Sequence, residues 1–581
     1  MHRALLGCVA LGWAGFAALP ALGAPEERRI CPGIVLRGEI DPGLSDMERR
    51  LVCGDPNPKE ANTDRLKFDD AWKKIPAPQA RYGLKNFLQD RGHFHPRFER
   101  QVETMIVELG PVARVTRFEV VGAPETLGPD RRRKLVGEKL TPAILDVAES
   151  WVKHRLESLG YPCPKLTTEA DPDTGVLRVG VEPGPLQNLV EVIEHDLPGI
   201  RGGVLRRYDA FQLGKPYSGD LLRVTENRVT SLGLFQSIRF VGACSERGAT
   251  ARQEIVAGPP RLLRFGVGLD TEGVVRVRAS WRNTRLGAMS SWFDITAQGS
   301  AKDQTLDLSF NWYHLAEPSR QSLRPSLRIR HGNEEFYEFL QARGQFAYST
   351  TYDSQEIGLS LLSGPTFEEL RTLRGVGPVS SRFTSWESRV QAQSHYHELF
   401  LSSPRTGWQS SVMAAFNSRS LASSLTAQRM AWDGRALWNW RELDPPLWVF
   451  GARWGFRTVV TGEDVTGVPP TFRQYLGGTA DLRGFGRQEV PGPNGSLSSG
   501  FVGLEARLVE TLPVGFEPFA FIDFGKTGVK PFSFDSPLFR SPGLGIRWAS
   551  PIGAFRTTVA RGLASGIEPR WQFYFSYGEE F

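Results

Sequence analysis

The chain has 581 residues, which is too long for one ordinary domain, so we expect several. Charged residues make up 23% of it and the mean hydropathy is −0.28, the balance of a soluble protein. The net charge of +6 would permit a nucleic-acid partner, but the longest basic run, residues 131–134, is interpreted as the solvated face of a predicted helix. The export signal described next also argues against nucleic acid.

The N-terminus has the pattern of a secretory signal peptide. His2 and Arg3 precede a short apolar run that ends in small residues, and we place cleavage after Gly23, so that residues 1–23 are removed. A retained anchor would need about 20 apolar residues followed by stop-transfer charges. The mature chain is therefore predicted to be exported, either as a soluble protein or as a membrane-inserted β-barrel.

Four cysteines remain after the signal peptide, an even number for an oxidising compartment, so one or two disulfides are expected. Four cysteines allow three pairings. We prefer Cys31–Cys53, because the short loop between these residues closes easily, and Cys163–Cys244 would then join neighbouring domains. The CxxC spacing of many metal sites is absent.

The first half of the sequence contains an internal repeat. Three times a helix-like stretch ends in glycine and runs into a strand, and each copy later reaches a strand that ends in Gly-Pro. The glycines that end the helix-like stretches are Gly92, Gly160 and Gly233, and those of the Gly-Pro pairs are Gly110, Gly184 and Gly258. The Gly-Pro glycines recur every 74 residues, and a fixed period of this size predicts tandem modules.

The middle copy is the clearest and predicts the order β-α-α-β-β. Thr141 and Pro142 form an N-cap and a first-turn proline, and Gly160 supplies the left-handed end of the helix. One small α/β domain per repeat follows. The predicted domains span residues 24–110, 111–184 and 185–258.

After residue 260 the helical pattern gives way to alternation with a period of two. Val275, Val277, Ala279 and Trp281 share one face of a predicted strand, with arginine and serine on the other. A soluble sandwich would also bury one apolar face. Because the pattern continues to residue 581, with arginine on the polar side, it favours a transmembrane barrel of about 16 antiparallel strands.

The final strand presents an aromatic face. Its residues Trp571, Phe573, Phe575 and Tyr577 are expected to point outward, and the chain ends at Phe581. A terminal aromatic strand of this kind is typical of the substrates of barrel-assembly machinery.

An enzyme is the first alternative, and the sequence gives it little support. GxSxG, HExxH and P-loop patterns are absent, and no Ser/His/Asp set can be assembled. His395 and His397 have the spacing of one strand face, but two histidines without a third ligand favour ordinary surface or lumen residues. His93 and His95 receive the same interpretation. No catalytic residue, metal or cofactor is predicted.

The sequence as a whole, with its repeats and its alternating strands, resembles the BamA/TamA outer-membrane insertase superfamily. The resemblance rests on "RFGVGLDTEG", "GGTADLRGFG", "GFVGLEARL", "FEPFAFIDFGKTG", "GLGIRWASPIGAFRTTVARGL" and the last strand. It implies a multidomain protein, with three periplasmic α/β POTRA (polypeptide-transport-associated) domains of β-α-α-β-β order before a 16-stranded antiparallel barrel at residues 261–581. Three repeats and the ending "FYFSYGEEF" are most similar to the TamA group.

Residues 461–499, approximately, are predicted to form the sixth extracellular loop, from the number of strands between them and the C-terminus. Alternation places Glu505 and Asp523 of two neighbouring strands in the same lumen, where a guanidinium could pair with one or both. The resemblance implies that the loop folds inward through its RGF motif, Arg483-Gly484-Phe485. It also implies that Glu505, Phe521 and Asp523 are the partners of the motif on the wall.

The resemblance implies a function in assembling or translocating β-barrel proteins such as autotransporters. The first and last strands would close the barrel at a weak seam that opens sideways to an incoming strand, and Gly266 and Gly268 would weaken the first strand. Expected partners are unfolded outer-membrane proteins, outer-membrane lipid and a TamB-like protein anchored in the inner membrane. The alternatives are a two-partner-secretion transporter of an adhesin or toxin, and a passive outer-membrane channel.

Overall fold

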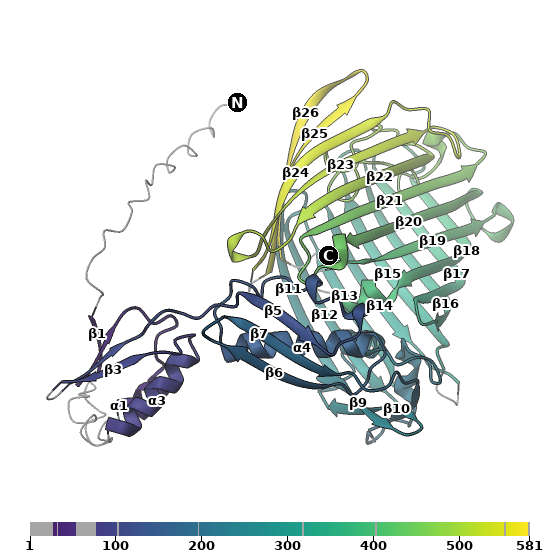
Figure 1. Ribbon diagram of the computed structural model, residues 1–581. Helices are drawn as coiled ribbons and strands as arrows, with labels where there is room; N and C mark the ends of the chain where they lie inside the picture. The colour runs from purple at the N-terminus through teal and green to yellow at the C-terminus, as the bar shows by residue number, and fades with distance from the viewer. Residues whose placement is uncertain are drawn as a thin grey trace, which may run out of the picture. The chain divides into compact units, whose positions relative to one another are not determined.

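The computed structural model describes residues 27–31, 33–53, 77–101, 104–195, 197–315, 319–400, 404–550 and 553–578 (Figure 1). The chain forms two compact units. One consists of residues 1–121, 134–150 and 167–180, and the other of residues 122–133, 151–166 and 181–581. The predicted signal peptide and Phe581 lie outside the described residues.

In its described residues, the first small domain combines a four-stranded sheet with two helices. Its core contains Ile34 and Val107 of the sheet and Leu84 and Leu88 of a helix, all fully buried. The strands lie in the order β1-β2-β4-β3. The elements are β1 (Glu27–Cys31), β2 (Ile34–Arg37), α1 (Asp46–Cys53), α3 (Ala77–Gln89), β3 (Arg97–Arg100) and β4 (Met105–Glu108).

Helix α1 begins with a capping box built by Ser45 and Glu48. The backbone N–H and hydroxyl of Ser45 donate to Glu48 Oε2 over 2.7 and 2.8 Å, and Glu48 N–H donates to Ser45 Oγ over 3.3 Å. The buried Arg91 donates from Nη1 and Nη2 to the two carboxylate oxygens of Glu48, each over 2.9 Å. Although burial acts to raise the pKa of Glu48, the bonds from Arg91 and Ser45 lower it to about 2.

This lowered pKa predicts an acid-sensitive first domain. The contribution of Glu48 to stability is fully present above its ordinary pKa of 4.5 and is lost as the pH falls to about 2, a loss of about 3 kcal/mol. Hydrogen exchange in α1 and α3, corrected for the intrinsic rate at each pH, should rise across that window. Glu48→Gln should remove the pH dependence, whereas Glu99→Gln on the exposed strand β3 should retain it. An unchanged pH profile in Glu48→Gln would contradict this account.

The second and third domains each carry a three-stranded sheet and one α-helix. The sheets have the orders β5-β7-β6 and β8-β10-β9. The second domain contains β5 (Arg117–Val121), α4 (Pro142–Ser158), β6 (Lys165–Asp171) and β7 (Val176–Glu182). The third contains β8 (Leu189–Ile193), α5 (Gly219–Leu232), β9 (Ser237–Ser245) and β10 (Gly248–Val256).

The repeated glycines occupy the same structural position in each copy. Gly92, Gly160 and Gly233 follow α3, α4 and α5 and have φ of 90°, 99° and 71°, a left-handed conformation that a side chain would strain. Helix α4 begins at Pro142, and Thr141 Oγ1 accepts the N–H of Ile144 over 3.4 Å.

The predicted β-α-α-β-β order is wrong for one helix of the second and third domains, which becomes short 3-10 helix. These segments are η2 (Glu125–Leu127), η3 (Pro129–Arg131) and η4 (Val204–Tyr208). Gly128, with φ of 61°, separates η2 from η3, and Pro129 has no N–H to continue a helix. Gly203, with φ of 76°, directly precedes η4.

The helix with a solvated basic face predicted at residues 131–134 is also wrong. Arg132 Nη1 donates to the carbonyl of Asp444 over 3.1 Å. Arg133 donates from its backbone N–H to the same carbonyl over 2.8 Å and from Nη1 to the carbonyl of Pro446 over 2.6 Å. The basic run is therefore held by carbonyl groups of a proline-containing turn between two later strands.

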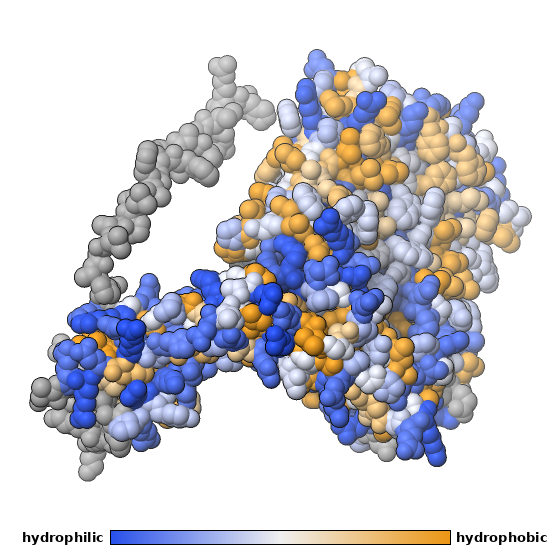
Figure 2. Space-filling view, in the orientation of Figure 1, coloured by the Kyte–Doolittle hydropathy of each residue, from blue (hydrophilic) through white to orange (hydrophobic). Residues whose placement is uncertain are grey.

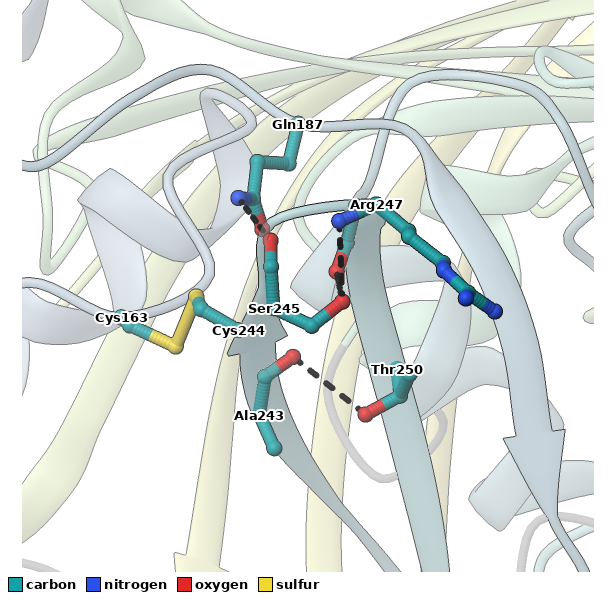
Figure 3. Close-up of a disulfide and its surroundings, with 8 residues drawn as sticks. Cys163, Gln187, Ala243, Cys244, Ser245, Arg247 and Thr250 are labelled. Atoms are coloured by element: carbon teal, nitrogen blue, oxygen red, sulfur yellow. Dashed lines mark hydrogen bonds between the residues drawn. A yellow bond between two sulfur atoms is a disulfide. The ribbon is translucent and has the colours of Figure 1, made fainter.

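A disulfide joins Cys163, just after α4, to Cys244 in β9 (Figure 3). Beside it, Gln187 Nε2 donates to the carbonyl of Ser245 over 3.0 Å. The bridge links the end of the second domain to the sheet of the third. Cys53 is buried and disulfide-bonded, but the side chain of Cys31 lies outside the described part of the chain, so the Cys31–Cys53 pairing stays a prediction.

A closed barrel of 16 strands follows, with antiparallel neighbours throughout (Figure 1). The predicted architecture of small α/β domains before a 16-stranded barrel is confirmed. The strands are β11 (Arg261–Asp270), β12 (Val274–Leu286), β13 (Ser291–Gly299), β14 (Asp303–Asn311), β15 (Ser322–Asn333), β16 (Glu338–Asp353), β17 (Ile357–Arg374), β18 (Ser380–Ser394), β19 (Gly407–Asn417), β20 (Ala427–Asn439), β21 (Trp448–Thr461), β22 (Ser498–Leu508), β23 (Phe516–Gly528), β24 (Phe539–Ser550), β25 (Gly553–Ala564) and β26 (Ile567–Gly578).

The two faces of the barrel wall differ as the alternation predicts. Val275 and Val277 are about half exposed, whereas Arg282 on the other face donates to Asp294 over 2.8 Å. Apolar side chains, coloured orange in Figure 2, cover much of the outer wall of the barrel. No helix in the described ranges combines the length and apolar character that crossing a membrane requires.

The histidine pairs have neighbours other than metal ligands. His395 and His397 lie in the short helix α6 (His395–Leu399), so their predicted strand spacing is wrong. His395 Nε2 lies 2.9 Å from the carbonyl oxygen of Ser354, and His93 Nδ1 lies 3.1 Å from that of Gly110. His95 forms an exposed contact with an aspartate. Within the described residues, no group of three or more His, Cys, Asp or Glu residues could hold a metal ion.

Candidate functional site: a docked loop and the barrel seam

Strands β22 and β23 build one wall of the lumen. In their register Glu505 lies opposite Phe521 and Gly503 lies opposite Asp523. The inward residues Phe521 and Asp523 are 6% and 0% exposed, whereas the outward residue Leu504 is 46% exposed. Alternation along two neighbouring strands therefore brings two carboxylates and an aromatic ring onto one inner surface.

Arg483 lies in the loop of residues 462–497 and reaches this wall. Its guanidinium donates to both carboxylates: Nε and Nη2 to the two oxygens of Asp523 over 2.9 and 2.8 Å, and Nη1 to Glu505 Oε2 over 2.8 Å. The guanidinium carbon lies 3.4 Å from the centre of the Phe521 ring. Arg483 is 2% exposed, so this planar fork satisfies a charge that burial would otherwise penalise.

Two glycines make the close approach possible. A Cβ atom on Gly503 would lie 2.6 Å from Asp523 Oδ1, so a side chain there would displace the carboxylate. A Cβ atom on Gly484 would lie 2.6 Å from the backbone nitrogen of Gly562 in β25. The loop backbone therefore rests directly on β25, and the glycine of the RGF motif permits that contact.

Phe485 completes the docking with apolar and polar contacts. Its side chain is 1% exposed and meets Phe539 edge to face, with ring centres 5.5 Å apart. The hydroxyl of Tyr574 in β26 donates to the carbonyl of Phe485 over 2.6 Å. Leu476, Leu482 and Val490 of the same loop belong to this buried cluster.

Three further residues hold the loop, and sequence reasoning missed all three. Arg453 Nη2 donates to Asp523 Oδ1 over 3.1 Å and to the carbonyl of Asp481 over 3.0 Å. Asp481 Oδ1 accepts the N–H of Gly477 over 2.6 Å. Arg487 donates to both oxygens of Glu334 over 2.9 and 2.7 Å. Alternation along β21 carried a signal for Arg453, but contacts inside an irregular loop have no periodicity to reveal them.

At the seam between the first and last strands, β11 and β26 share two residue pairs among the described residues, Leu269 with Tyr577 and Asp270 with Ser576. The N–H of Thr271, just after β11, also donates to the carbonyl of Phe575 over 3.0 Å. By contrast, β14 and β15 share seven and β17 and β18 share fifteen. On its other side β11 is fully paired, with Gly266 opposite Arg278 and Gly268 opposite Arg276.

The four aromatic residues predicted for the outer face of β26 differ in exposure. Trp571 and Phe573 are 67% and 58% exposed on the outer face. Phe575 and Tyr577 are half-buried and contact Phe555 of β25, with ring centres 6.4 and 4.4 Å from it. The strand thus pairs closely with β25 while contributing little to the seam.

A family model matches the barrel, and several solved structures are similar to the chain at low identity. The model described as the Omp85 superfamily domain matches residues 262–581. BamA from Haemophilus ducreyi lacking POTRA domains 1–3 is similar at 13% identity, over 80% of this chain and 99% of that chain, with a TM-score of 0.48. CdiB from Acinetobacter baumannii is similar at 12% identity, over 81% and 90%, and CdiB from Escherichia coli at 12%, over 86% and 97%, each with a TM-score of 0.45.

Proposed function

Because this chain belongs to the Omp85 superfamily, we propose that it assembles or translocates β-strand proteins at the outer membrane of a Gram-negative bacterium. Its substrates are unfolded outer-membrane proteins, including autotransporters. The barrel spans the outer membrane in contact with its lipid, and the three small domains extend into the periplasm as POTRA domains. No enzymatic step is part of this proposal.

The short seam between β11 and β26 is the observation that carries the proposal. Among the described residues this junction has two residue pairs and the hydrogen bond from Thr271, whereas its neighbours have ten or more. Because a backbone hydrogen bond contributes about 1 kcal/mol net, the junction should open at less cost than they do. Opening exposes a strand edge, which can pair with an incoming strand by β-augmentation. The Arg483 contacts hold the loop against β22 and β23, the backbone of Gly484 packs on β25, and together they keep the rest of the wall rigid while the seam moves.

The three periplasmic repeats support a TamA-like role within this function. We propose that they receive or orient substrates, with a TamB-like protein anchored in the inner membrane as partner. Folding energy of the substrate, or such a partner, supplies the driving force.

Depletion of the protein followed by profiling of the outer membrane tests the proposal. Assembled β-barrel substrates should fall several-fold while lipoproteins of the same membrane stay constant. A passive channel would leave the profile of assembled barrels unchanged, and that outcome would refute an assembly function. Loss of a single secreted adhesin, with all barrels unaffected, would instead indicate two-partner secretion.

A further inference from the structure

A cavity of about 1020 Å³ lies in the lumen between the docked loop and the seam. Arg483 of the loop contributes to its lining, and Phe265, Gly266 and Val267 of β11 line it beside Tyr577 of β26. The cavity therefore reaches the part of the barrel wall that the seam interrupts.

Among the described residues, the lining of this cavity carries an excess of positive charge. One lining residue, Glu505, is a carboxylate, and two more carboxylates, Glu517 and Asp523, contact the lining arginines. The six lining arginines are Arg435, Arg453, Arg483, Arg507, Arg547 and Arg556. The described residues thus place six guanidinium groups but three carboxylates at this cavity.

Each carboxylate is shared by two arginines. Glu505 Oε2 accepts from Arg483 over 2.8 Å and from Arg556 over 3.0 Å. Glu517 Oε2 lies 2.9 Å from Arg547 Nη1 and 3.7 Å from Arg507 Nε. Asp523 Oδ1 likewise forms ion pairs with Arg483 of the loop and Arg453 of the wall. Among the described residues, the positive charges at this cavity therefore outnumber the negative ones.

Arg435 shows the imbalance most directly. Its Nη2 lies 2.9 Å from His397 Nε2 and 3.4 Å from Gln409 Oε1, both uncharged partners. Burial and the neighbouring Arg435 lower the pKa of His397, so the imidazole stays neutral near pH 7 and its Nε2 accepts a hydrogen bond from the guanidinium N–H. The positive charge of Arg435 therefore has no carboxylate contact among the described residues.

The same cavity adjoins a strand suited to polypeptide. Among the described residues, β26 pairs with β11 at Leu269 and Asp270, and opening of this seam, as the proposed function requires, would present the backbone of β11 as a free edge beside the cavity. Extended chain bound to that edge would gain backbone hydrogen bonds, and every second side chain would point into the lumen. Neither a free phosphate nor a lipid headgroup would use such an edge.

We propose that the arginine-lined cavity selects incoming segments that carry carboxylates, either acidic side chains or a terminal carboxylate, while their backbone pairs with the edge of β11. This inference rests on the proposed function and adds a charge preference to it. Positive charge at the mouth of a confined site also raises the local concentration of acidic segments before they bind.

Binding of labelled peptides to the full chain in detergent micelles tests the inference. The peptides share one alternating apolar–polar sequence and carry either glutamate or glutamine at the polar positions, each with a free or an amidated C-terminus. The glutamate peptide should bind at least tenfold more tightly at low salt, and added salt should reduce the difference. The free and amidated forms distinguish a terminal carboxylate from acidic side chains.

Arg435→Gln and Arg507→Gln should each reduce the preference for glutamate at least threefold. Arg507→Gln removes a partner of Glu517, whereas Arg435 has no carboxylate partner among the described residues to lose. Arg435→Gln should therefore fold normally, and it still tests the inference if Arg507→Gln folds poorly. Arg328→Gln is the matched control, because Arg328 bonds Asp307 over 2.6 Å and does not line the cavity. Heat-modifiable mobility of each variant checks that its barrel is folded.

Equal binding of the glutamate and glutamine peptides would overturn the charge preference but leave the proposed function standing, because backbone pairing needs no charge. Displacement of the glutamate peptide by inorganic phosphate or by phosphatidylglycerol vesicles, at concentrations equal to its own, would assign the arginines to phosphate groups instead. If neither peptide binds and depletion leaves assembled barrels unchanged, both the inference and the proposed function are wrong.

Discussion

An Arg483→Ala chain is expected to release the loop of residues 462–497 from the lumen and to lose most of its assembly activity. The substitution removes three side-chain hydrogen bonds and the stacking on Phe521. It leaves Asp523, which is 0% exposed, with Arg453 as its remaining arginine. Breaking a buried pair from one side costs about 3 kcal/mol. The docked loop should therefore open, although the barrel itself should still form.

Protease cleavage within residues 462–497 and heat-modifiable mobility measure this effect, and substrate assembly in cells measures its consequence. Arg483→Lys should be intermediate, because an ammonium group keeps the charge but cannot form the planar fork. Arg457→Ala is the matched control: Arg457 bonds Asp433 over 2.8 Å at a partly exposed position, so its loss should cost less than about 1 kcal/mol. Wild-type protection of the loop in Arg483→Ala would show that the apolar contacts alone hold it.

The barrel could be predicted because its pattern depends on geometry that repeats. Each strand alternates between the two faces of the wall, so Asp523 and Glu505 could be placed in the lumen from their positions in neighbouring strands. The repeat glycines were equally informative, because Gly233 and its counterparts need a backbone conformation that few other residues adopt. Structural constraints that act between neighbouring residues can therefore be predicted from the sequence.

Contacts between distant segments could not be predicted in the same way. The basic run that includes Arg133 looked like a helix face, but carbonyl groups more than 300 positions later accept its hydrogen bonds. Arg487 of the loop likewise bonds Glu334 just after β15, and no local sequence pattern links these two residues. The short 3-10 helices of the second and third domains have a local cause, because Gly128 and Pro129 interrupt one segment and Gly203 precedes the other.

A disulfide across the seam is expected to abolish substrate assembly reversibly. Leu269 and Tyr577 lie opposite each other in β11 and β26, and the Cα atoms of opposite residues in antiparallel strands are about 4.5 to 5.5 Å apart, within reach of a disulfide. Leu269→Cys/Tyr577→Cys should therefore oxidise and fix the strands that the proposed function requires to separate. Assembly should fall at least tenfold and return on reduction.

The control is Val267→Cys/Val277→Cys, which bridges β11 and β12 at an opposed pair inside the wall. That bridge adds the same chemistry to a junction of ten residue pairs, which stays closed in the proposed mechanism, so assembly should remain near the wild-type level. Wild-type protein treated with the same reductant accounts for any effect of opening Cys163–Cys244. If the oxidised seam variant assembles substrates normally, opening between β11 and β26 is not part of the mechanism, and substrates must pass by another route.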